Sequence, residues 1–309
     1  MPTIITRGSM SATGFGLFRA TTGGDGTFGI FAIGAITCSS EQYTYATGVV
    51  ANGTSFTTNM NGTSAAGNTS AGIFAQGTGI GCYSANRYKY TYSGSSVSAG
   101  GAATSASSFG SATGNSTTGI FALGVSQAAG FCRSTTRNKY TYSTDGVSAG
   151  GAATAASRYG SAAGNATVGI FALGCVSGVG ISTTRDKYTY SGDTVSAGGA
   201  ATAASIWGSA AGNSTVGIFA LGCTSAGAST TRNKYTYSSC VVSAGGAATV
   251  ASNRGSATGN STTGIFALGN STKTRNKYTY SSCTVASATA SNLNSYYGSA
   301  TSNGNTGVI

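Results

Sequence analysis

The sequence contains no histidine and only five acidic residues among 309. General acid-base catalysis, Ser-His-Asp triads and histidine metal sites all depend on these residue types. Asp145 and Asp193 stand at equivalent positions of an internal repeat, which indicates turn chemistry rather than a catalytic carboxylate pair. We therefore expect a protein that is not an enzyme and that uses no cofactor or metal.

Long apolar segments are also missing. The chain has no run of eighteen consecutive apolar residues, and residues 1–7 lack the apolar stretch of a signal peptide. We expect no membrane span and synthesis in the cytoplasm of the producing cell. Only 7% of residues are charged, yet the net charge is +11, which favours attraction to acidic polysaccharide, lipopolysaccharide or nucleic acid.

The seven cysteines show no C-x-x-C spacing, so neither a zinc site nor a thioredoxin-type motif is indicated. Five of them recur in one loop of successive repeats, and two share another position. These are Cys38, Cys82, Cys132, Cys175 and Cys223, and then Cys240 and Cys283. We expect free thiols made in a reducing cell.

Two phrases recur through the chain. Gly-Ile-Phe-Ala-Leu-Gly or a relative begins every 43 to 50 residues, and a Tyr-Thr-Tyr phrase lies between successive copies. The first phrase begins at Gly29, Gly72, Gly119, Gly169, Gly217, Gly264 and, truncated, Gly307. Apolar residues at such fixed places argue against disorder. One structural unit of about 47 residues is therefore repeated.

Each unit reads as four short strands. In one copy these are residues 160–163, the doubly apolar 168–173, the alternating 183–190 and the glycine-rich 194–201. Gly164 and Asn165 predict a tight hairpin turn with positive φ angles. The alternation in 183–190 predicts that its tyrosines pack against the next unit and that Arg185 and Lys187 face solvent.

Four-stranded units of this length are typical of β-propeller blades. The order of a Gly-Ser-Ala strand, a Gly-Ile-Phe-Ala-Leu-Gly strand and a strand ending in tyrosines resembles the kelch repeat. The double glycine and the tryptophan usual in that repeat are absent. The Lys-Tyr-Thr-Tyr phrases look like those of glycine- and threonine-rich repeat proteins of bacteriophages, cyanophages in particular. This resemblance implies a virion protein, such as a tail fibre.

Blade number follows from counting strands. Residues 1–309 are predicted to form one domain of seven blades, with residues 1–15 and 297–309 sharing the closing blade. Six blades with a loose end are the alternative. As a third option, the half-blades pair between molecules and build a fibre.

Two sets of residues are candidates for binding. Five Arg-x-Lys dyads predict a basic girdle that either grips an anionic scaffold or only keeps the rim solvated. The other set lies just before the first strand of each unit, where the repeats differ. It comprises Arg19, Phe109, Arg158, Tyr159, Trp207, Arg254, Tyr296 and Tyr297.

The variable set is expected on one side of the disc, around the propeller mouth. Mixed aromatic and arginine side chains suit stacking on sugars or docking of peptide. The competing interpretation is that they only seal the blade junctions.

We therefore expect a recognition or assembly module of a phage virion. Its partners would be host surface polysaccharide, other virion proteins or copies of itself. Nucleic acid is disfavoured, because no recognised binding module is present. A purely structural decoration or a self-assembling fibre subunit is the alternative.

Overall fold

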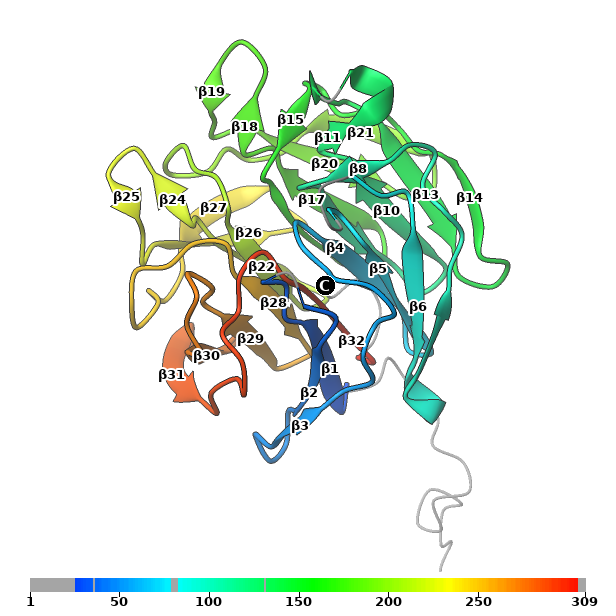
Figure 1. Ribbon diagram of the computed structural model, residues 1–309. Helices are drawn as coiled ribbons and strands as arrows, with labels where there is room; N and C mark the ends of the chain where they lie inside the picture. The colour runs from blue at the N-terminus through cyan, green and yellow to red at the C-terminus, as the bar shows by residue number, and fades with distance from the viewer. Residues whose placement is uncertain (1–25, 36, 79–82, 131, 305–309) are drawn as a thin grey trace, which may run out of the picture.

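Six four-stranded antiparallel sheets surround a central axis (Figure 1). The structure is a computed structural model, and it describes residues 26–35, 37–78, 83–130 and 132–304. Each sheet is one blade, and its strands are named from the inner to the outer. Blade 1 contains β32 (Ser299–Ser302), β1 (Phe28–Ala32), β2 (Ser40–Thr44) and β3 (Val50–Asn52). Blade 2 contains β4 (Ser64–Gly67), β5 (Ala71–Ala75), β6 (Arg87–Thr91) and β7 (Ser96–Ala99).

The other four blades repeat this order. Blade 3 contains β9 (Ser111–Gly114), β10 (Thr118–Ala122), β13 (Arg137–Thr141) and β14 (Gly146–Ala149), and blade 4 contains β16 (Ser161–Gly164), β17 (Val168–Ala172), β20 (Arg185–Thr189) and β21 (Thr194–Ala197). Blade 5 contains β22 (Ser209–Gly212), β23 (Val216–Ala220), β26 (Arg232–Thr236) and β27 (Val241–Ala244), and blade 6 contains β28 (Ser256–Gly259), β29 (Thr263–Ala267), β30 (Arg275–Thr279) and β31 (Thr284–Ala288).

Short elements complete the connections between strands. They are β8 (Ser107–Ser108), β11 (Val125–Ser126), β12 (Cys132–Arg133), β15 (Ser157–Arg158), β18 (Cys175–Val176), β19 (Gly180–Ile181), β24 (Cys223–Thr224), β25 (Gly227–Ala228) and the 3-10 turns η2 (Tyr92–Gly94) and η3 (Gln127–Ala129). The strands β8 and β15 pair with β11 and β18. The connection entering a blade therefore lies beside the loop between its second and third strands, on one face of the disc.

The inner strands contact one another in the closed order β32, β4, β9, β16, β22, β28 and back to β32. This confirms the all-β propeller of four-stranded antiparallel blades. The described residues form six blades, so the predicted seven is corrected to the alternative of six. Among these residues, no helix has the length and apolar character needed to cross a bilayer.

The two ends of the described chain meet in blade 1. β32 pairs antiparallel with β1, with Gly29 opposite Ser302 and Ala32 opposite Ser299. The first unit therefore takes its inner strand from the C-terminal segment, which removes the need for a seventh blade. The closing blade consists of residues 299–302 and 28–52. The half-blades required for a fibre are absent from the described residues, and residues 1–15, predicted to contribute to closure, lie outside them.

The core runs from blade to blade because the second strand is buried on both sides. Ile170 packs with Phe219 and Tyr235 of blade 5, whereas Phe171 packs with Ile120 of blade 3. Both side chains are fully buried. Each blade thus contributes one apolar layer to each junction, which explains why the phrase is apolar at every position.

The turn after the first strand differs from its prediction. Gly164 has no positive φ. Asn165 Oδ1 instead accepts hydrogen bonds from the backbone N–H groups of Thr167 and Val168, at 2.9 Å each. The same Asn165 side chain donates to the carbonyl of Ser214 in the next blade. This Asx turn ties neighbouring blades together.

The second tyrosine of each Tyr-Thr-Tyr phrase points at the inner strand of the preceding blade. Tyr92 forms a 3.1 Å hydroxyl contact with Thr301. At the corresponding site of another junction stands Ala163, and the buried hydroxyl of Tyr237 there has no hydrogen-bond partner among the residues that the structure describes. The junctions are therefore unequal in polar satisfaction.

Candidate functional site

A ring of backbone hydrogen bonds encircles the mouth of the central channel. One residue from each blade contributes its N–H and its carbonyl, and each N–H donates to the carbonyl of the residue in the preceding blade over 2.8–3.1 Å. We call these the mouth residues. They are Gly62, Phe109, Tyr159, Trp207, Arg254 and Tyr297. The last bond, from the N–H of Gly62 to the carbonyl of Tyr297, closes the ring.

Every mouth residue adopts a left-handed backbone conformation. The φ angle is 58° at Phe109, 61° at Tyr159 and 56° at Trp207, against 61° at Gly62. Only glycine adopts this conformation without steric cost, and bulky residues there are conformational outliers. Five large side chains are thus held where glycine would be the least strained choice.

The side chains of the mouth residues pack on one another edge to face. Ring centroids of Phe109 and Tyr159 lie 4.9 Å apart, those of Tyr159 and Trp207 5.4 Å, and those of Phe109 and Tyr297 5.3 Å. All four rings are half-buried. The cluster therefore keeps an apolar surface in contact with solvent.

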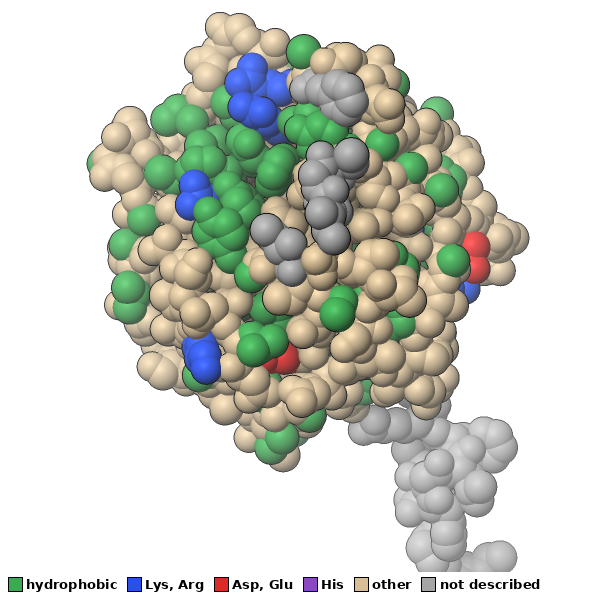
Figure 2. All heavy atoms as spheres, in the orientation of Figure 1, with side chains coloured by type: hydrophobic (Ala, Val, Ile, Leu, Met, Phe, Trp, Pro, Cys, Tyr) green, Lys and Arg blue, Asp and Glu red, His purple; other side chains and the backbone are tan. Residues whose placement is uncertain are grey.

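Arginines complete this cluster. The guanidinium of Arg254 lies 4.1 Å from the ring centroid of Trp207 and 5.2 Å from that of Tyr297, and that of Arg158 lies 4.7 Å from Tyr159. Figure 2 shows hydrophobic side chains gathered on this face with basic side chains beside them. Burial raises the pKa of Tyr297, and Arg254 partly offsets this shift. The rings and the cations form one surface.

The space at the mouth is small. A cavity of about 60 Å³ lies between the mouth residues, and one of about 70 Å³ lies below it between the Ser and Ala side chains of the inner strands. Such volumes accommodate a few waters. A larger ligand would therefore rest on the mouth rather than enter the channel.

The structure brings together the variable residues predicted from the sequence. Phe109, Tyr159, Trp207, Arg254 and Tyr297 are mouth residues, and Arg158 and Tyr296 flank them. Arg19 lies outside the described residues.

Sequence reasoning missed Gly62, the sixth mouth position. An alignment on the Ser-Ala pair of the first strand would have found it, because Gly62 and Phe109 each stand two residues before that pair.

The arginines of the Arg-x-Lys dyads are placed differently from their prediction. They are fully buried between blades, so neither the gripping girdle nor the solvated rim describes them. Each guanidinium lies 4.4–4.6 Å from the ring centroid of a phenylalanine in the next blade. They are Arg87, Arg137, Arg185, Arg232 and Arg275. Strand alternation was predicted correctly, but the face with arginine meets the next blade and the tyrosines meet the preceding one.

Each buried arginine also donates to an acceptor in the next blade. Arg137 forms a 2.7 Å ion pair with Asp186, and Arg275 forms a 2.6 Å ion pair with Glu41. In the other three junctions an asparagine oxygen accepts at 3.0–3.1 Å. Burial lowers the pKa of Arg87 to about 10, so this guanidinium remains charged at neutral pH.

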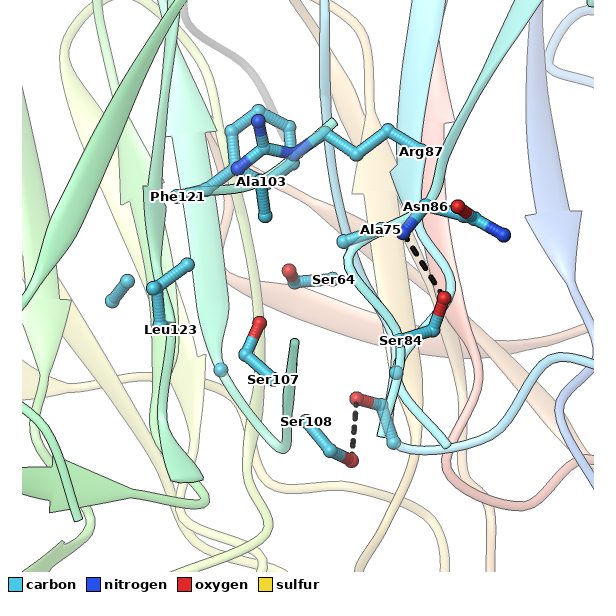
Figure 3. A pocket seen from close by; sticks show the side chains of 14 residues that line it. Ser64, Ala75, Ser84, Asn86, Arg87, Ala103, Ser107, Ser108, Phe121 and Leu123 are labelled. Carbon is cyan, nitrogen blue, oxygen red and sulfur yellow. Dashed lines mark hydrogen bonds between the residues drawn. The ribbon is translucent and has the colours of Figure 1, made fainter. Parts of the chain in front are cut away.

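Figure 3 shows one such junction, with the Arg87 side chain against Phe121 beside a cavity lined by Ser64, Ser107 and Ser108. The cavity has a volume of about 10 Å³, which suits about one water molecule. It lies inside a blade junction, and we assign it no ligand.

The junction between blades 1 and 2 replaces arginine by an aromatic ring. Ser40 stands at the arginine position, and Phe56 packs 5.0 Å from Phe74 and 5.7 Å from Tyr88. Phe56 thus fills the space that a guanidinium occupies elsewhere.

The described acids lie away from the mouth. Glu41 and Asp186 are buried in junctions, and Asp145 and Asp193 form 2.8 Å ion pairs with Lys89 and Lys139. The described part of the mouth is therefore basic and aromatic, with no carboxylate among its residues.

Comparison with known proteins supports the fold alone. No family model matches the sequence, and no curated protein matches it. A solved structure titled "Structure of YjhT" aligns with a TM-score of 0.63 and 8% identity, covering 78% of this chain and 87% of that chain.

Proposed function

We propose that this propeller is a non-enzymatic recognition module of a bacteriophage particle, as a tail fibre or tail-associated protein, and that its mouth binds glycans of the host surface. The observation that carries the proposal is the left-handed backbone of five large mouth residues. Strain of this kind costs about 1–3 kcal/mol per residue and clusters at functional sites. Gly62 marks the unstrained alternative.

The chemistry of the mouth fits a sugar. Half-buried tyrosine and tryptophan rings provide surfaces for stacking on pyranose rings, and guanidinium groups donate hydrogen bonds to hydroxyl or acidic groups. The net charge of +11 favours approach to an anionic envelope. The small mouth cavity favours a polymer lying across the face.

The test is binding of the purified chain to a panel of bacterial envelope polysaccharides. The double variant Tyr159→Gly, Trp207→Gly removes two rings. It introduces glycine, the residue at the mouth position of blade 2 (Gly62). Val241→Ala, which shortens an exposed side chain on an outer strand, is the matched control. Circular dichroism verifies folding.

We expect binding by the wild type and the control and loss of binding in the double glycine variant. Equal binding by all three proteins would refute the role of the mouth. Absence of binding to every envelope would favour the alternative of a purely structural virion decoration.

A further inference from the structure

The turn between the third and fourth strands places one residue under a lysine of the preceding blade. In two junctions this residue is an aspartate: Lys89 Nζ lies 2.8 Å from Asp145, and Lys139 Nζ lies 2.8 Å from Asp193. A tyrosine of the same hairpin also donates to the carboxylate. For Asp145 this donor is the Tyr140 hydroxyl at 2.7 Å. Each carboxylate thus joins two donors across a blade junction.

In the next two junctions a cysteine takes the place of the aspartate. Lys187 Nζ lies 3.7 Å from Cys240 Sγ, and Lys234 Nζ lies 3.5 Å from Cys283 Sγ. The backbone is unchanged, because φ is 56° at Cys240 and 55° at Asp145. The lysine therefore meets sulfur where the two aspartate junctions offer a carboxylate oxygen.

The tyrosines of these two hairpins are left without an oxygen acceptor in the turn. Tyr235 and Tyr278 are fully buried, and neither hydroxyl has a hydrogen-bond partner within normal distance among the described residues. The neighbouring thiols are only weak acceptors, whereas the equivalent hydroxyl of Tyr188 donates to Asp193 at 2.6 Å. A buried hydroxyl without a partner is costly. Both hairpins therefore lack an oxygen atom at the position that the Asp193 carboxylate occupies in its own hairpin.

We propose that Cys240 and Cys283 are oxidation sites, which hydrogen peroxide converts to sulfinates that reproduce the contacts of Asp145 and Asp193. A sulfinate carries two oxygens and one negative charge, as a carboxylate does. One oxygen would accept from the lysine and the other from the orphaned tyrosine. Both thiols are half-buried, which leaves them accessible to peroxide.

The chemistry balances with two molecules of peroxide. The cysteine sulfur attacks one peroxide oxygen, the O–O bond breaks, and the other oxygen leaves as water, giving a sulfenic acid. A second peroxide oxidises this to the sulfinic acid and releases a second water, and the acid then loses its proton. The sulfur is oxidised and the peroxide reduced in both steps. The lysine ammonium, 3.5–3.7 Å from the sulfur, would donate a proton to the departing oxygen.

The test is mass spectrometry of the whole chain after a time course with hydrogen peroxide. We expect addition of two oxygens, about 32 Da, at Cys240 and Cys283, about threefold or more faster than at Cys132. Cys132 is exposed and serves as the reference thiol. Equal rates at all three cysteines would overturn the proposal.

Lysine variants distinguish an effect of the neighbouring lysine from simple solvent exposure of the thiol. Lys187→Met should slow oxidation of Cys240 to about the rate of Cys132 and leave Cys283 unchanged within the same molecule. Lys234→Met should do the reverse. If either variant slowed both cysteines equally, or if a Lys-Cys cross-link were the main product, the proposal would fail.

An aspartate substitution tests the product state without an oxidant. Cys240→Asp should raise the midpoint of thermal unfolding, because it supplies the acceptor that Lys187 and Tyr235 lack. Cys240→Ser, which is of similar size and uncharged, should not raise it. A midpoint for Cys240→Asp at or below that of Cys240→Ser would contradict the proposed mimicry.

Discussion

Replacing one buried arginine tests how charge is distributed between the blades. In Arg137→Met the aliphatic chain remains, but Asp186 loses the guanidinium 2.7 Å away and stays fully buried. Thr154 then supplies the remaining hydrogen bonds to this carboxylate, from its N–H and its hydroxyl. Breaking a buried ion pair by removing one partner costs about 3–5 kcal/mol. We expect this loss in the free energy of unfolding at neutral pH.

The chain contains its own control. Arg185 lies 4.6 Å from a phenylalanine ring as Arg137 does at 4.4 Å, but its acceptor is the neutral Asn233. Arg185→Met leaves an amide that still bonds to Thr202. We expect a loss of about 1–3 kcal/mol, typical of an unsatisfied neutral group. The difference of about 2 kcal/mol between the variants measures the destabilisation caused by leaving the buried Asp186 carboxylate without its cation.

Urea unfolding of wild type and variants gives these differences from the midpoint and slope of each transition. A third protein, Arg137→Met with Asp186→Asn, removes the charge along with its partner and should recover to the level of Arg185→Met. Equal losses in the two single variants would refute the reasoning. So would a double variant no more stable than Arg137→Met.

Two further predictions concern other junction contacts. Ala163→Thr should stabilise the protein by about 1 kcal/mol, because it offers the Tyr237 hydroxyl a hydrogen-bond partner. Thermal unfolding measures this gain. The same gain in a Tyr237→Phe background would contradict the explanation. Burial raises the pKa of Asp145, but hydrogen bonds from Lys89 and Tyr140 outweigh it and leave the pKa below its ordinary value. The contribution of Asp145 to stability is therefore present above about pH 3.9, the pKa of an aspartate in the unfolded chain, and is lost as the pH falls through the folded pKa. Asp145→Asn should flatten this part of the profile of stability against pH, measured by thermal unfolding.

The strands could be predicted because their patterns are local. The segment 168–173 is apolar on both faces, and β17 lies there at Val168–Ala172. The blade number was less accessible, since the pairing of β32 with β1 joins residues that are far apart in the sequence. The sequence showed an incomplete unit at each end, but not which strands each end lacked.

The mouth residues could be predicted from the sequence, whereas the burial of the arginines at the blade junctions could not. The residues before the first strand differ from repeat to repeat, and this variation pointed to the mouth residues. Positions that pack in the same way in every blade keep similar residues, so positions that vary are easy to recognise. Alternation placed Arg185 and Lys187 on one face, but it carries no information on whether that face meets water or another blade. The useful signal was the Asn, Asp or Glu that the next blade presents to each arginine, which becomes meaningful only once the blades are adjacent.

The hydrogen-bonded ring at the mouth uses only backbone atoms, so the identity of each side chain there is separate from the closure of the disc. Glycine, arginine, tryptophan, tyrosine and phenylalanine all occupy the same backbone position around one circle. Five of these six positions already hold large side chains, so substitutions there would change the surface while the backbone ring stays closed, whereas a Cβ at Gly62 would lie 2.7 Å from the Phe109 ring. The chemistry of the mouth can therefore vary from blade to blade while its backbone geometry stays constant.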